Sequence, residues 1–362
     1  MKRNYYIFSS GKFARKHNTL YFEPGEQAEP EEDTHEEEIE IEDDGVEEED
    51  NEYNEPKPMP AKPIPVEDIE AIYAFSQLRF NTRFLNFLAK HQITLHLFNY
   101  YGYYTGSFYP RDPYISGKLL VQQVTTYTNP ETRTIIAQKF VNGSAQNIKK
   151  NLQYYNARGK DMSPFIPKIE ELAEKIKDAK DVQELMGIEG NIRSTYYTTW
   201  PLIIDEPFDF DKRQKRPPNN PLNALISFGN SLVYTSILSE IYKTQLNPLI
   251  SYLHEPGERR FSLALDLAEI FKPLLADRLI FSLLNKKQLQ KKHFDENLNY
   301  CYLNEQGRKI YLKEFDAKLK TTIKHRKLKK SVSYRHLMRL ECYKLIKHIL
   351  GEKEYEPFKI WW

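Results

Sequence analysis

The sequence predicts an α+β protein, with a small N-terminal β domain (residues 1–108) that contains one helix and a larger all-α C-terminal domain (residues 109–362). Three observations predict this class. Short runs of β-branched and aromatic residues, separated by turn residues, fill the first part of the chain. From Pro110 onward, apolar residues recur at helical spacing almost to the end. A chain of 362 residues is also long enough for two domains and a sizeable core.

The predicted β domain begins with two β-rich runs at 5–8 and 19–22, which we expect to pair as a hairpin across a basic connection. Residues 69–75 and 93–97 predict two further strands. His96 falls opposite the aliphatic side chains of its strand, which favours a surface or structural histidine over a metal ligand. A Tyr-rich hairpin is expected around Gly106. One helix is predicted from aromatic and aliphatic residues at helical spacing, namely Phe80, Phe84, Phe87 and Leu88.

An acidic stretch interrupts this domain. Residues 23–55 hold 19 Asp and Glu and no Lys or Arg, and five prolines follow between 56 and 65. Like charges repel and proline extends the chain, so we interpret residues 24–62 as a disordered acidic insert. Two interpretations of its role stay open. The insert either competes weakly with a polyanionic partner for basic sites or shields the protein from non-specific binding of that partner, or it is a tolerated surface insertion without a role.

The net charge of +1 hides an uneven distribution of charge. Without those 19 acidic residues, 52 Lys and Arg stand against 32 Asp and Glu, a net charge near +20. A body this basic favours a polyanionic partner, and nucleic acid is the commonest one. A general solubility charge is the alternative.

The cysteine content and the N-terminus bear on the compartment. Cys301 and Cys342 form no C-x-x-C pair, which excludes a zinc ribbon and a disulfide framework. The first residues turn polar at once, unlike a signal peptide, and no apolar run approaches the length of a membrane span. The sequence therefore predicts a cytoplasmic protein without a membrane segment.

Within the helical part, residues 118–126 predict the start of a helix, and residues 131–156 and 166–179 predict amphipathic helices. Between 318 and 330, seven of thirteen residues are Lys or Arg, and we expect a basic helix that continues towards residue 350. The aromatic residues that follow, ending in Trp361 and Trp362, would suit docking after phosphate binding. A solvated basic face explains the same pattern.

Two segments of the helical part carry unusual polar residues. Glu189 lies between Gly187 and Gly190, and each glycine costs a helix about 1 kcal/mol relative to alanine. Close approach of a metal or of another helix would compensate for that cost. Asn223, Ser227 and Asn230 form one polar stripe at i, i+4 and i+7, which is either an internal hydrogen-bond network or a surface that faces a substrate.

A third segment combines a histidine with two acids. His254 lies in a Pro-Gly turn, and the apolar helix that follows carries Asp266 and Glu269 on one face at i and i+3. Such acid pairs are most often solvated, but the apolar neighbours here leave the acids in need of partners. Carboxylate and imidazole ligands without cysteine suit Mg²⁺ or Mn²⁺ better than structural zinc. A metal held beside a basic surface points to phosphodiester chemistry.

Four motifs, in order along the chain, resemble the CRISPR-associated integrase, the metal-dependent DNA nuclease and integrase of the spacer-acquisition module. The similarity covers the chain except for the acidic insert, and its first and last segments look like the branch that accompanies type I-B systems. The motifs are Gly-Ile-Glu-Gly-Asn at 187–191, Arg-Pro-Pro-x-x-Pro-Leu-Asn-Ala-Leu-Ile-Ser-Phe-Gly at 216–229, His-Glu-Pro-Gly at 254–257 and Ser-Leu-Ala-Leu-Asp-Leu-Ala-Glu at 262–269.

This resemblance implies a function and a set of site residues. Glu189, His254 and Glu269 are expected to hold Mg²⁺ or Mn²⁺, and Asp266 to support that site. The expected partners are double-stranded DNA (the prespacer and the CRISPR repeat), a second copy in a symmetric homodimer and a small companion adaptation protein. The expected reaction inserts 3′-OH ends into the repeat by transesterification. Candidates for DNA contact or for support of the metal ligands are Arg193, Tyr197, Arg216, Asn223, Ser227, Arg259 and Arg260.

Two other functions stay open. A metal-dependent DNA nuclease of the repair type would use the same metal, with water in place of a 3′-OH as the nucleophile. A structural DNA-binding subunit would carry out no chemistry, although the complete set of Glu189, His254 and Glu269 favours an enzyme.

Overall fold

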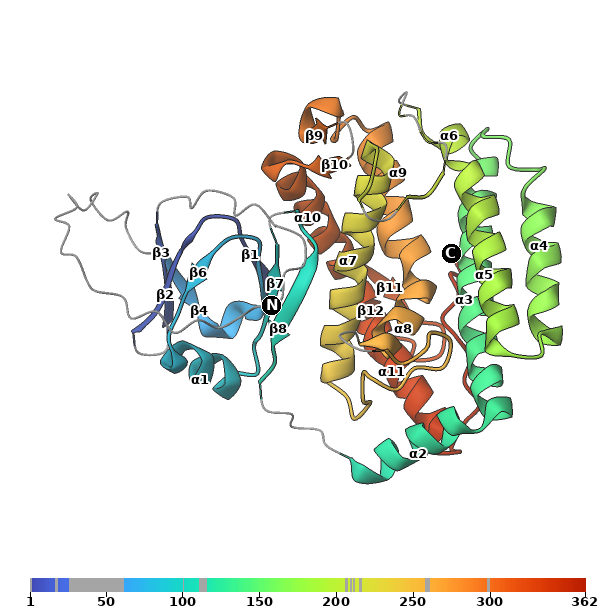
Figure 1. Cartoon of the computed structure of the whole chain (residues 1–362), viewed down its shortest axis with the longest axis horizontal. Helices are drawn as coiled ribbons and strands as arrows, with labels where there is room; N and C mark the ends of the chain where they lie inside the picture. The colour runs from blue at the N-terminus through green and yellow to red at the C-terminus, as the bar shows by residue number, and fades with distance from the viewer. Residues whose placement is uncertain are drawn as a thin grey trace, which may run out of the picture. The chain divides into compact units, whose positions relative to one another are not determined.

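The computed structural model describes residues 2–16, 19–25, 62–99, 101–110, 116–205, 208, 210, 212–214, 217–257, 261–297 and 300–362. The chain divides into two compact units, Met1–Arg111 and Asp112–Trp362 (Figure 1). The first unit is built mainly from strands and the second mainly from helices. The predicted α+β class is therefore confirmed.

The first sheet of the N-terminal unit has the strand order β1-β5-β7-β8. Its strands are β1 (Arg3–Ile7), β5 (Ile69–Ala74), β7 (Thr94–Phe98) and β8 (Tyr104–Phe108). The pairs β1/β5 and β5/β7 are parallel, and β8 pairs antiparallel with β7. Ile72 and Leu95 on its central strands are fully buried.

The second sheet has the order β4-β3-β2-β6. Its strands are β4 (Lys62–Pro65), β3 (Thr19–Pro24), β2 (Gly11–Lys16) and β6 (Leu78–Arg79). A 3₁₀ turn, η1 (Val66–Asp68), leads from β4 into β5. The predicted helix is α1 (Thr82–Lys90), which begins where the Asn81 side chain accepts the Phe84 amide. The rings of Phe13 and Phe84 stack at 4.8 Å and join this sheet to the helix.

Three expectations for this unit need correction. The segment at 5–8 does not pair with 19–22, because β1 joins β5 in the other sheet while β3 pairs with β2. The expected basic connection is itself strand β2, which buries Phe13 between Lys12 and Ala14. Gly106 lies inside β8, and the chain turns before β8, where the Asn99 side chain accepts the Tyr103 amide.

His96 is a structural histidine, because it is fully buried and its Nδ1 lies 2.7 Å from Ser107 Oγ. The surface alternative is excluded. The acidic insert lies outside the described residues, apart from its ends at Pro24, Gly25 and Lys62.

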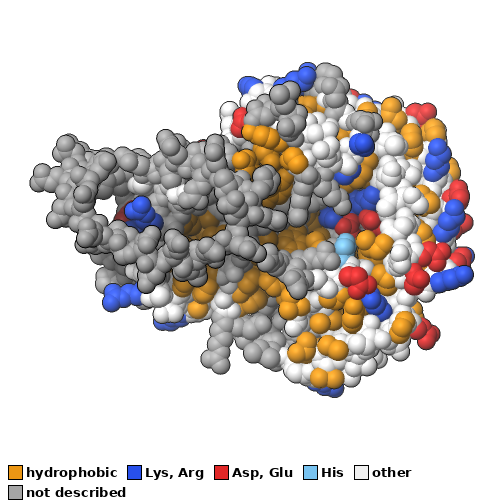
Figure 2. Space-filling view, viewed as in Figure 1, with side chains coloured by type: hydrophobic (Ala, Val, Ile, Leu, Met, Phe, Trp, Pro, Cys, Tyr) orange, Lys and Arg blue, Asp and Glu red, His pale blue; other side chains and the backbone are white. Residues whose placement is uncertain are grey.

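The C-terminal unit begins with five helices. These are α2 (Gly117–Thr128), α3 (Pro130–Asn156), α4 (Ile166–Lys175), α5 (Val182–Thr198) and α6 (Trp200–Ile203), with a 3₁₀ turn, η2 (Ile176–Asp178), after α4. Figure 2 shows acidic and basic side chains interspersed along the edge of this unit, where Figure 1 places α4. The predicted helices at 118–126 and 131–156 are confirmed as α2 and α3, and α4 with η2 covers 166–178 of the third predicted helix.

Two apolar helices form the centre of the unit. Helix α7 (Pro221–Tyr242) is buried along most of its length, as expected of a helix that is apolar all round. It packs against α8 (Ser262–Lys272), and α8 also packs against α3. A π-helical turn, η3 (Pro273–Asp277), joins α8 directly to α9 (Arg278–Asn285).

The last part of the chain adds two short hairpins to the predicted all-α unit. The 3₁₀ turn η4 (Lys291–His293) precedes the first hairpin, β9 (Phe294–Asn297) with β10 (Tyr300–Leu303). Helix α10 (Glu305–Lys320) leads to the second, β11 (Thr322–Lys324) with β12 (Ser331–Ser333), and α11 (Tyr334–Ile349) follows. The predicted basic helix at 318–330 is thus wrong, because most of that segment is a hairpin.

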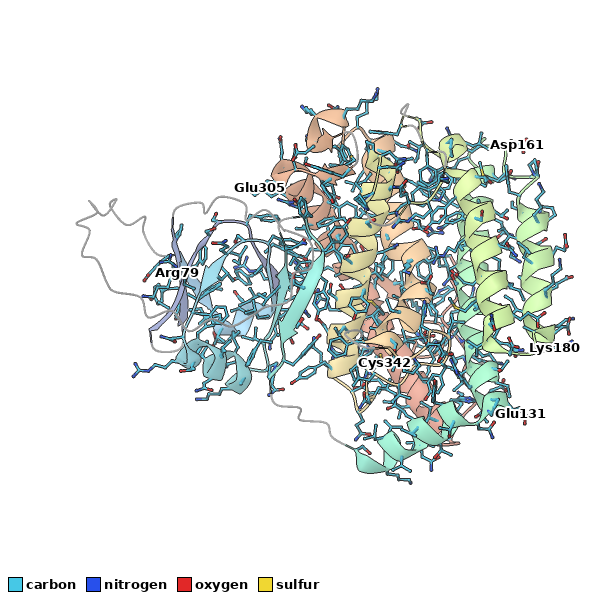
Figure 3. The ribbon with its side chains drawn as sticks, viewed as in Figure 1. Arg79, Glu131, Asp161, Lys180, Glu305 and Cys342 are labelled. Carbon is cyan, nitrogen blue, oxygen red and sulfur yellow. The ribbon has the colours of Figure 1, made fainter. Side chains whose placement is uncertain are left out.

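Both cysteines are free and buried, and Cys342 lies inside the helical unit (Figure 3). In the part of the chain that the structure describes, no helix is both long enough and apolar enough to cross a membrane.

Candidate metal and catalytic site

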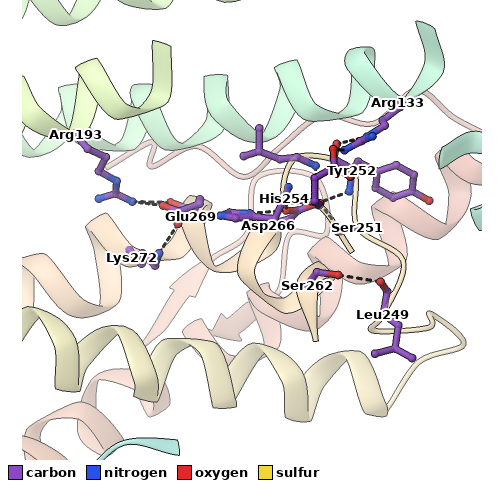
Figure 4. Close-up of polar contacts among 12 residues, drawn as sticks. Arg133, Arg193, Leu249, Ser251, Tyr252, His254, Ser262, Asp266, Glu269 and Lys272 are labelled. Atoms are coloured by element: carbon purple, nitrogen blue, oxygen red, sulfur yellow. Dashed lines mark hydrogen bonds and ion pairs between the residues drawn. The ribbon is translucent and has the colours of Figure 1, made fainter. Parts of the chain in front are cut away.

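Asp266 organises the turn that carries the histidine. This fully buried carboxylate accepts the backbone amides of Tyr252 at 2.7 Å, Leu253 at 3.0 Å and His254 at 2.9 Å (Figure 4). Three consecutive N–H groups thus point at one acid from α8. A buried carboxylate needs such donors, because its charge is otherwise costly. The turn is therefore fixed to the helix that also carries Glu269.

The imidazole of His254 completes this arrangement. Its Nδ1 lies 2.8 Å from Asp266 Oδ1, so the other ring nitrogen, Nε2, points away from that carboxylate. Burial alone would lower the pKa of His254, but the hydrogen bond and charge of Asp266, together with the charge of Glu269, raise it overall. A histidine whose Nδ1–H is held by a carboxylate is the usual form of a metal-binding histidine.

Glu269 is held by two cations. Its Oε2 accepts a hydrogen bond from Arg193 Nη2 at 2.7 Å, and its Oε1 pairs with Lys272 one turn further along α8 (Figure 4). Burial alone would raise the pKa of Glu269, but Lys272 and Arg193 lower it well below its usual range. Glu269 is therefore ionised while it is almost completely buried.

Arg193 brings the second acid into the same site. Helix α5 places Glu189 and Arg193 at i and i+4, and Arg193 Nε lies 3.3 Å from Glu189 Oε1. Burial and the nearby charge of Glu269 raise the pKa of Glu189. One buried guanidinium thus bridges carboxylates from α5 and α8.

Asp277 is a third acid around Arg193. Its Oδ2 lies 3.6 Å from Arg193 Nη1 and has no hydrogen-bond partner among the described residues. Burial raises the pKa of Asp277 to about 7, although Arg193 opposes that shift. Asp277 ends the π-helical turn η3, a feature that often occurs at functional sites.

Whether these residues can hold a metal follows from their donors. Across the described ranges, no three or more His, Cys, Asp or Glu side chains stand in an arrangement that would hold an ion. The donors nevertheless fit a divalent cation. Glu189 is partly buried and Glu269 is buried, and Arg193 and Lys272 compensate the charge of these acids in place of a metal. His254 has its Nδ1 occupied by Asp266, which leaves Nε2 as its donor atom. Oxygen and nitrogen ligands of this kind suit Mg²⁺ or Mn²⁺.

The polar stripe on α7 forms a hydrogen-bond network with a loop. The Asn223 amide accepts from Arg213 Nη1 and the Gln214 backbone and donates to the Lys212 carbonyl and to Asn219. Ser227 Oγ accepts from Arg213 Nη2 at 2.9 Å. Of the two interpretations of this stripe, the structure favours the internal network for Asn223 and Ser227.

Of the remaining candidates for DNA contact or support of the metal ligands, one is described by the structure and three are not. Tyr197 on α5 packs its ring against Tyr196, Trp200 and Phe210, and burial raises its pKa to about 12. Arg216, Arg259 and Arg260 lie outside the described residues.

Sequence reasoning missed Lys272, Asp277 and Arg213. Lys272 lies at i+3 from Glu269, a spacing that could have revealed it. Asp277 lies at the end of the π-helical turn, which no sequence pattern marks. Gly187 and Gly190 have open space where a side chain would project, so among the described residues no close neighbour explains them.

Comparisons with known proteins identify the family and the fold of this chain. The family model described as CRISPR associated protein Cas1 matches residues 5–317. The CRISPR-associated endonuclease Cas1 of Fusobacterium nucleatum subsp. nucleatum is 47% identical over 362 residues, which covers all of this chain and 98% of that protein. The solved structure of a CAS1 protein from Thermotoga maritima is 38% identical, with a TM-score of 0.79 over 98% of this chain and 100% of that one.

These similarities define the class of the protein as a CRISPR-associated endonuclease, which is an enzyme. Within that class, the chain belongs to the Cas1 family. The prediction of an endonuclease and integrase of CRISPR adaptation is confirmed by this membership. A casposase bound to integration product has the same fold, with a TM-score of 0.81 over 99% of this chain and 93% of that one at 20% identity.

Proposed function

We propose that this endonuclease joins the 3′-OH ends of a prespacer to the CRISPR repeat by transesterification, with Mg²⁺ or Mn²⁺ held by Glu189, His254 and Glu269. The observation that carries the proposal is the binding of Asp266 to three consecutive amides and to His254 Nδ1. This arrangement leaves Nε2 of His254 as the ring nitrogen for a metal, next to the ionised Glu269.

The reaction exchanges one phosphodiester bond for another. The prespacer 3′-oxygen forms a bond to the scissile phosphorus while the bond from that phosphorus to the 3′-oxygen of the repeat strand breaks. The attacking hydroxyl loses its proton, and the leaving oxygen gains one. When bound, the divalent ion polarises the phosphate and stabilises the two oxygens that exchange.

The protein residues have separate tasks in this proposal. Asp266 fixes the orientation of His254, while Arg193 and Lys272 keep Glu269 ionised and in place. Because Arg193 is buried among acids, we assign it to support of the metal ligands and not to DNA contact. Asn223 and Ser227 hold the Arg213 loop, and Arg216, Arg259 and Arg260 are proposed DNA contacts.

The proposed assembly follows from the family resemblance of the four motifs. It consists of a symmetric homodimer that acts with a small companion adaptation protein on double-stranded DNA, in the branch that accompanies type I-B systems. The basic body of the chain supports a DNA substrate. Two free buried cysteines are compatible with a proposed cytoplasmic location.

Strand transfer from a labelled prespacer tests the proposal. The protein and its companion are mixed with a supercoiled plasmid that carries the repeat, in Mg²⁺ or Mn²⁺, and wild type is compared with His254→Ala. Label joined to plasmid by wild type alone supports the integrase and the role of His254. The control is His336→Ala, at a partly buried histidine on α11.

Other outcomes separate the alternatives. Plasmid cutting without joining favours a repair-type nuclease. Equal joining by wild type and His254→Ala excludes His254 as a metal ligand. DNA binding without cutting or joining in either metal favours a structural subunit.

A further inference from the structure

The helical unit contains a basic cavity that is separate from the residues of the metal site. Four segments line it: α3, the turn between β11 and β12, α11 and the C-terminal tail (residues 351–362). Its volume is about 690 Å³, within the range of roughly 300–1,000 Å³ that small-molecule sites occupy. Glu189, His254 and Glu269 are not among its lining residues.

Positive charge dominates this cavity. Among the described residues, no carboxylate pairs with three of its cations, Lys150, Arg326 and Lys359. Its two acids are already engaged: Glu356 pairs with Lys327 at 2.7 Å, and buried Glu341 pairs with Lys344. Glu341 also accepts from the Phe358 amide at 2.8 Å. The cavity therefore retains positive charge for an anionic ligand.

The pKa of a histidine in the wall responds to this charge. Burial and the neighbouring Lys344 and Lys327 lower the pKa of His325. A neutral imidazole is favoured where the surrounding potential is positive.

An aromatic ring borders the same charges. Trp361 has the Arg326 guanidinium 5.7 Å from the centre of its ring and His325 edge-on at 5.7 Å. The Arg326 Nη2 donates to the Trp361 carbonyl at 3.1 Å, which fixes the cation beside the ring. Indole rings next to cations are the common platform for unpaired nucleobases.

A polar group in the wall still needs a donor. Asn142 Oδ1 is buried and has no hydrogen-bond partner in the described part of the chain. A buried acceptor without a partner costs about 1–3 kcal/mol. A phosphate dianion alone would not supply an N–H, whereas the amino or imino groups of a nucleobase would.

We propose that this cavity binds an unpaired nucleotide of single-stranded DNA. The cations Lys150, Arg326 and Lys359 would contact its phosphates, Trp361 its base, and Asn142 an N–H on that base. A duplex hides its base faces in the stack, so the ligand is a single-stranded end or overhang. The proposal rests on the proposed function only in taking DNA as the polymer.

The cavity wall is joined to the helix that carries the metal-site acids. Asn147 on α3 donates to the carbonyls of Ile270 at 2.9 Å and Phe358 at 3.2 Å, and its Oδ1 accepts the Ile360 amide at 2.7 Å. The rings of Phe271 and Phe358 stack at 5.2 Å. The tail that lines the cavity therefore packs directly on the end of α8.

Binding of a short oligothymidylate in EDTA tests this site, because strand transfer cannot occur there. We compare wild type with the double variant Lys150→Gln/Arg326→Gln by fluorescence anisotropy. Loss of two phosphate contacts should weaken binding about tenfold or more. It should also reduce the slope of the logarithm of the binding constant against the logarithm of the salt concentration by roughly 1.4. The matched control is Lys168→Gln/Lys180→Gln, two exposed lysines outside the cavity.

Tryptophan fluorescence gives a second readout. Trp200 is fully buried, so quenching by the oligonucleotide reports on Trp361 and Trp362, and Trp361→Phe should abolish most of it. The proposal is overturned if the double variant binds like the control, or if duplex DNA loses as much affinity as the single strand. It is also overturned if thymidine monophosphate binds as tightly as the oligonucleotide. Failure of strand transfer in the earlier assay would leave these measurements unaffected.

Discussion

At the scale of single residues, Asp266 shows how a buried acid can shape the proposed metal site without being one of its proposed ligands. Its two oxygens serve three backbone amides and one imidazole nitrogen. An amide in place of the carboxylate keeps the shape but can present only one acceptor oxygen. The NH₂ group of the amide would then face N–H groups that now donate to a carboxylate oxygen, and this repulsion would tilt His254 away from its present orientation.

Asp266→Asn is therefore expected to lower the affinity for Mn²⁺ by about 10–100-fold. Titration followed by the electron paramagnetic resonance of free Mn²⁺ measures this without any DNA. The exposed Asp161→Asn serves as the control, because that acid bonds only its neighbour Ser163 among the described residues. Unchanged Mn²⁺ affinity in a folded Asp266→Asn protein would remove Asp266 from the site.

Asp277 gives a prediction about pH. Its folded-state pKa is about 7, above its ordinary value of 3.8, mainly because it is buried. Between these two values the folded state holds a proton that the unfolded state has released. The protonation of Asp277 therefore contributes fully to the free energy of unfolding below pH 3.8, and this contribution is lost as pH rises through 7. Through Asp277, the free energy of unfolding changes by at most about 1.4 kcal/mol per pH unit.

The variant Asp277→Asn lacks this titration. We expect the stability of wild type relative to the variant to fall as pH rises from 5 to 8, by roughly 1–3 kcal/mol. Urea unfolding of both proteins at four pH values measures the difference. Parallel pH profiles would show that Asp277 does not titrate in this range.

At the scale of elements, local patterns predicted helices and strands better than their pairing. The spacing of apolar residues revealed α1, α3 and β5, because one buried face imposes a regular period. The parallel pairing of β1 with β5 was missed, since it joins segments more than sixty residues apart. The hairpin of β11 and β12 was missed because Lys and Arg suit an exposed turn as well as a helix.

Two glycines offer a test of packing between elements. A Cβ at Gly229 on α7 would collide with the Tyr311 hydroxyl and approach Ala276, whereas a Cβ at Gly190 on α5 would meet open space. Gly229→Ala should therefore destabilise the protein by about 1–3 kcal/mol through overpacking. Gly190→Ala should stabilise it by about 0.5–1 kcal/mol through helix propensity.

Chemical denaturation of both variants measures these opposite signs. Strand transfer by Gly190→Ala adds a functional readout. A more stable but less active variant would show that the space beside Glu189 is used by metal or DNA. Destabilisation by Gly190→Ala would contradict the packing described for α5.

At the scale of the whole molecule, the site draws residues from segments far apart in the chain. Glu189 and Arg193 come from α5, His254 from a loop, and Glu269 and Lys272 from α8. Motifs could nominate the acids and the histidine, because those residue types carry metal chemistry. They could not show that Arg193 and Lys272 compensate the acids, since this depends on how α5 and α8 pack.

The acidic insert affects the electrostatics of the whole chain. Its 19 acids nearly cancel the positive charge of the remainder, so we hypothesise that it competes weakly with DNA for basic sites. Strands β3 and β4 pair directly, with Phe22 opposite Lys62, so a short connection can replace the segment between them. Deletion of residues 26–56 leaves 23–25 and 57–61 to close that hairpin.

The deleted protein is expected to bind DNA more tightly at low salt, by about tenfold, and to approach wild type at high salt, where charge is screened. Anisotropy with one duplex across a salt series measures both limits. Replacement of the same segment by an uncharged Gly-Ser linker of equal length controls for loop length. If the deletion variant and the linker variant both bind DNA like wild type at low salt, the insert is a tolerated surface insertion. If only the deletion variant binds more tightly, the bulk of the insert and not its charge limits access to DNA.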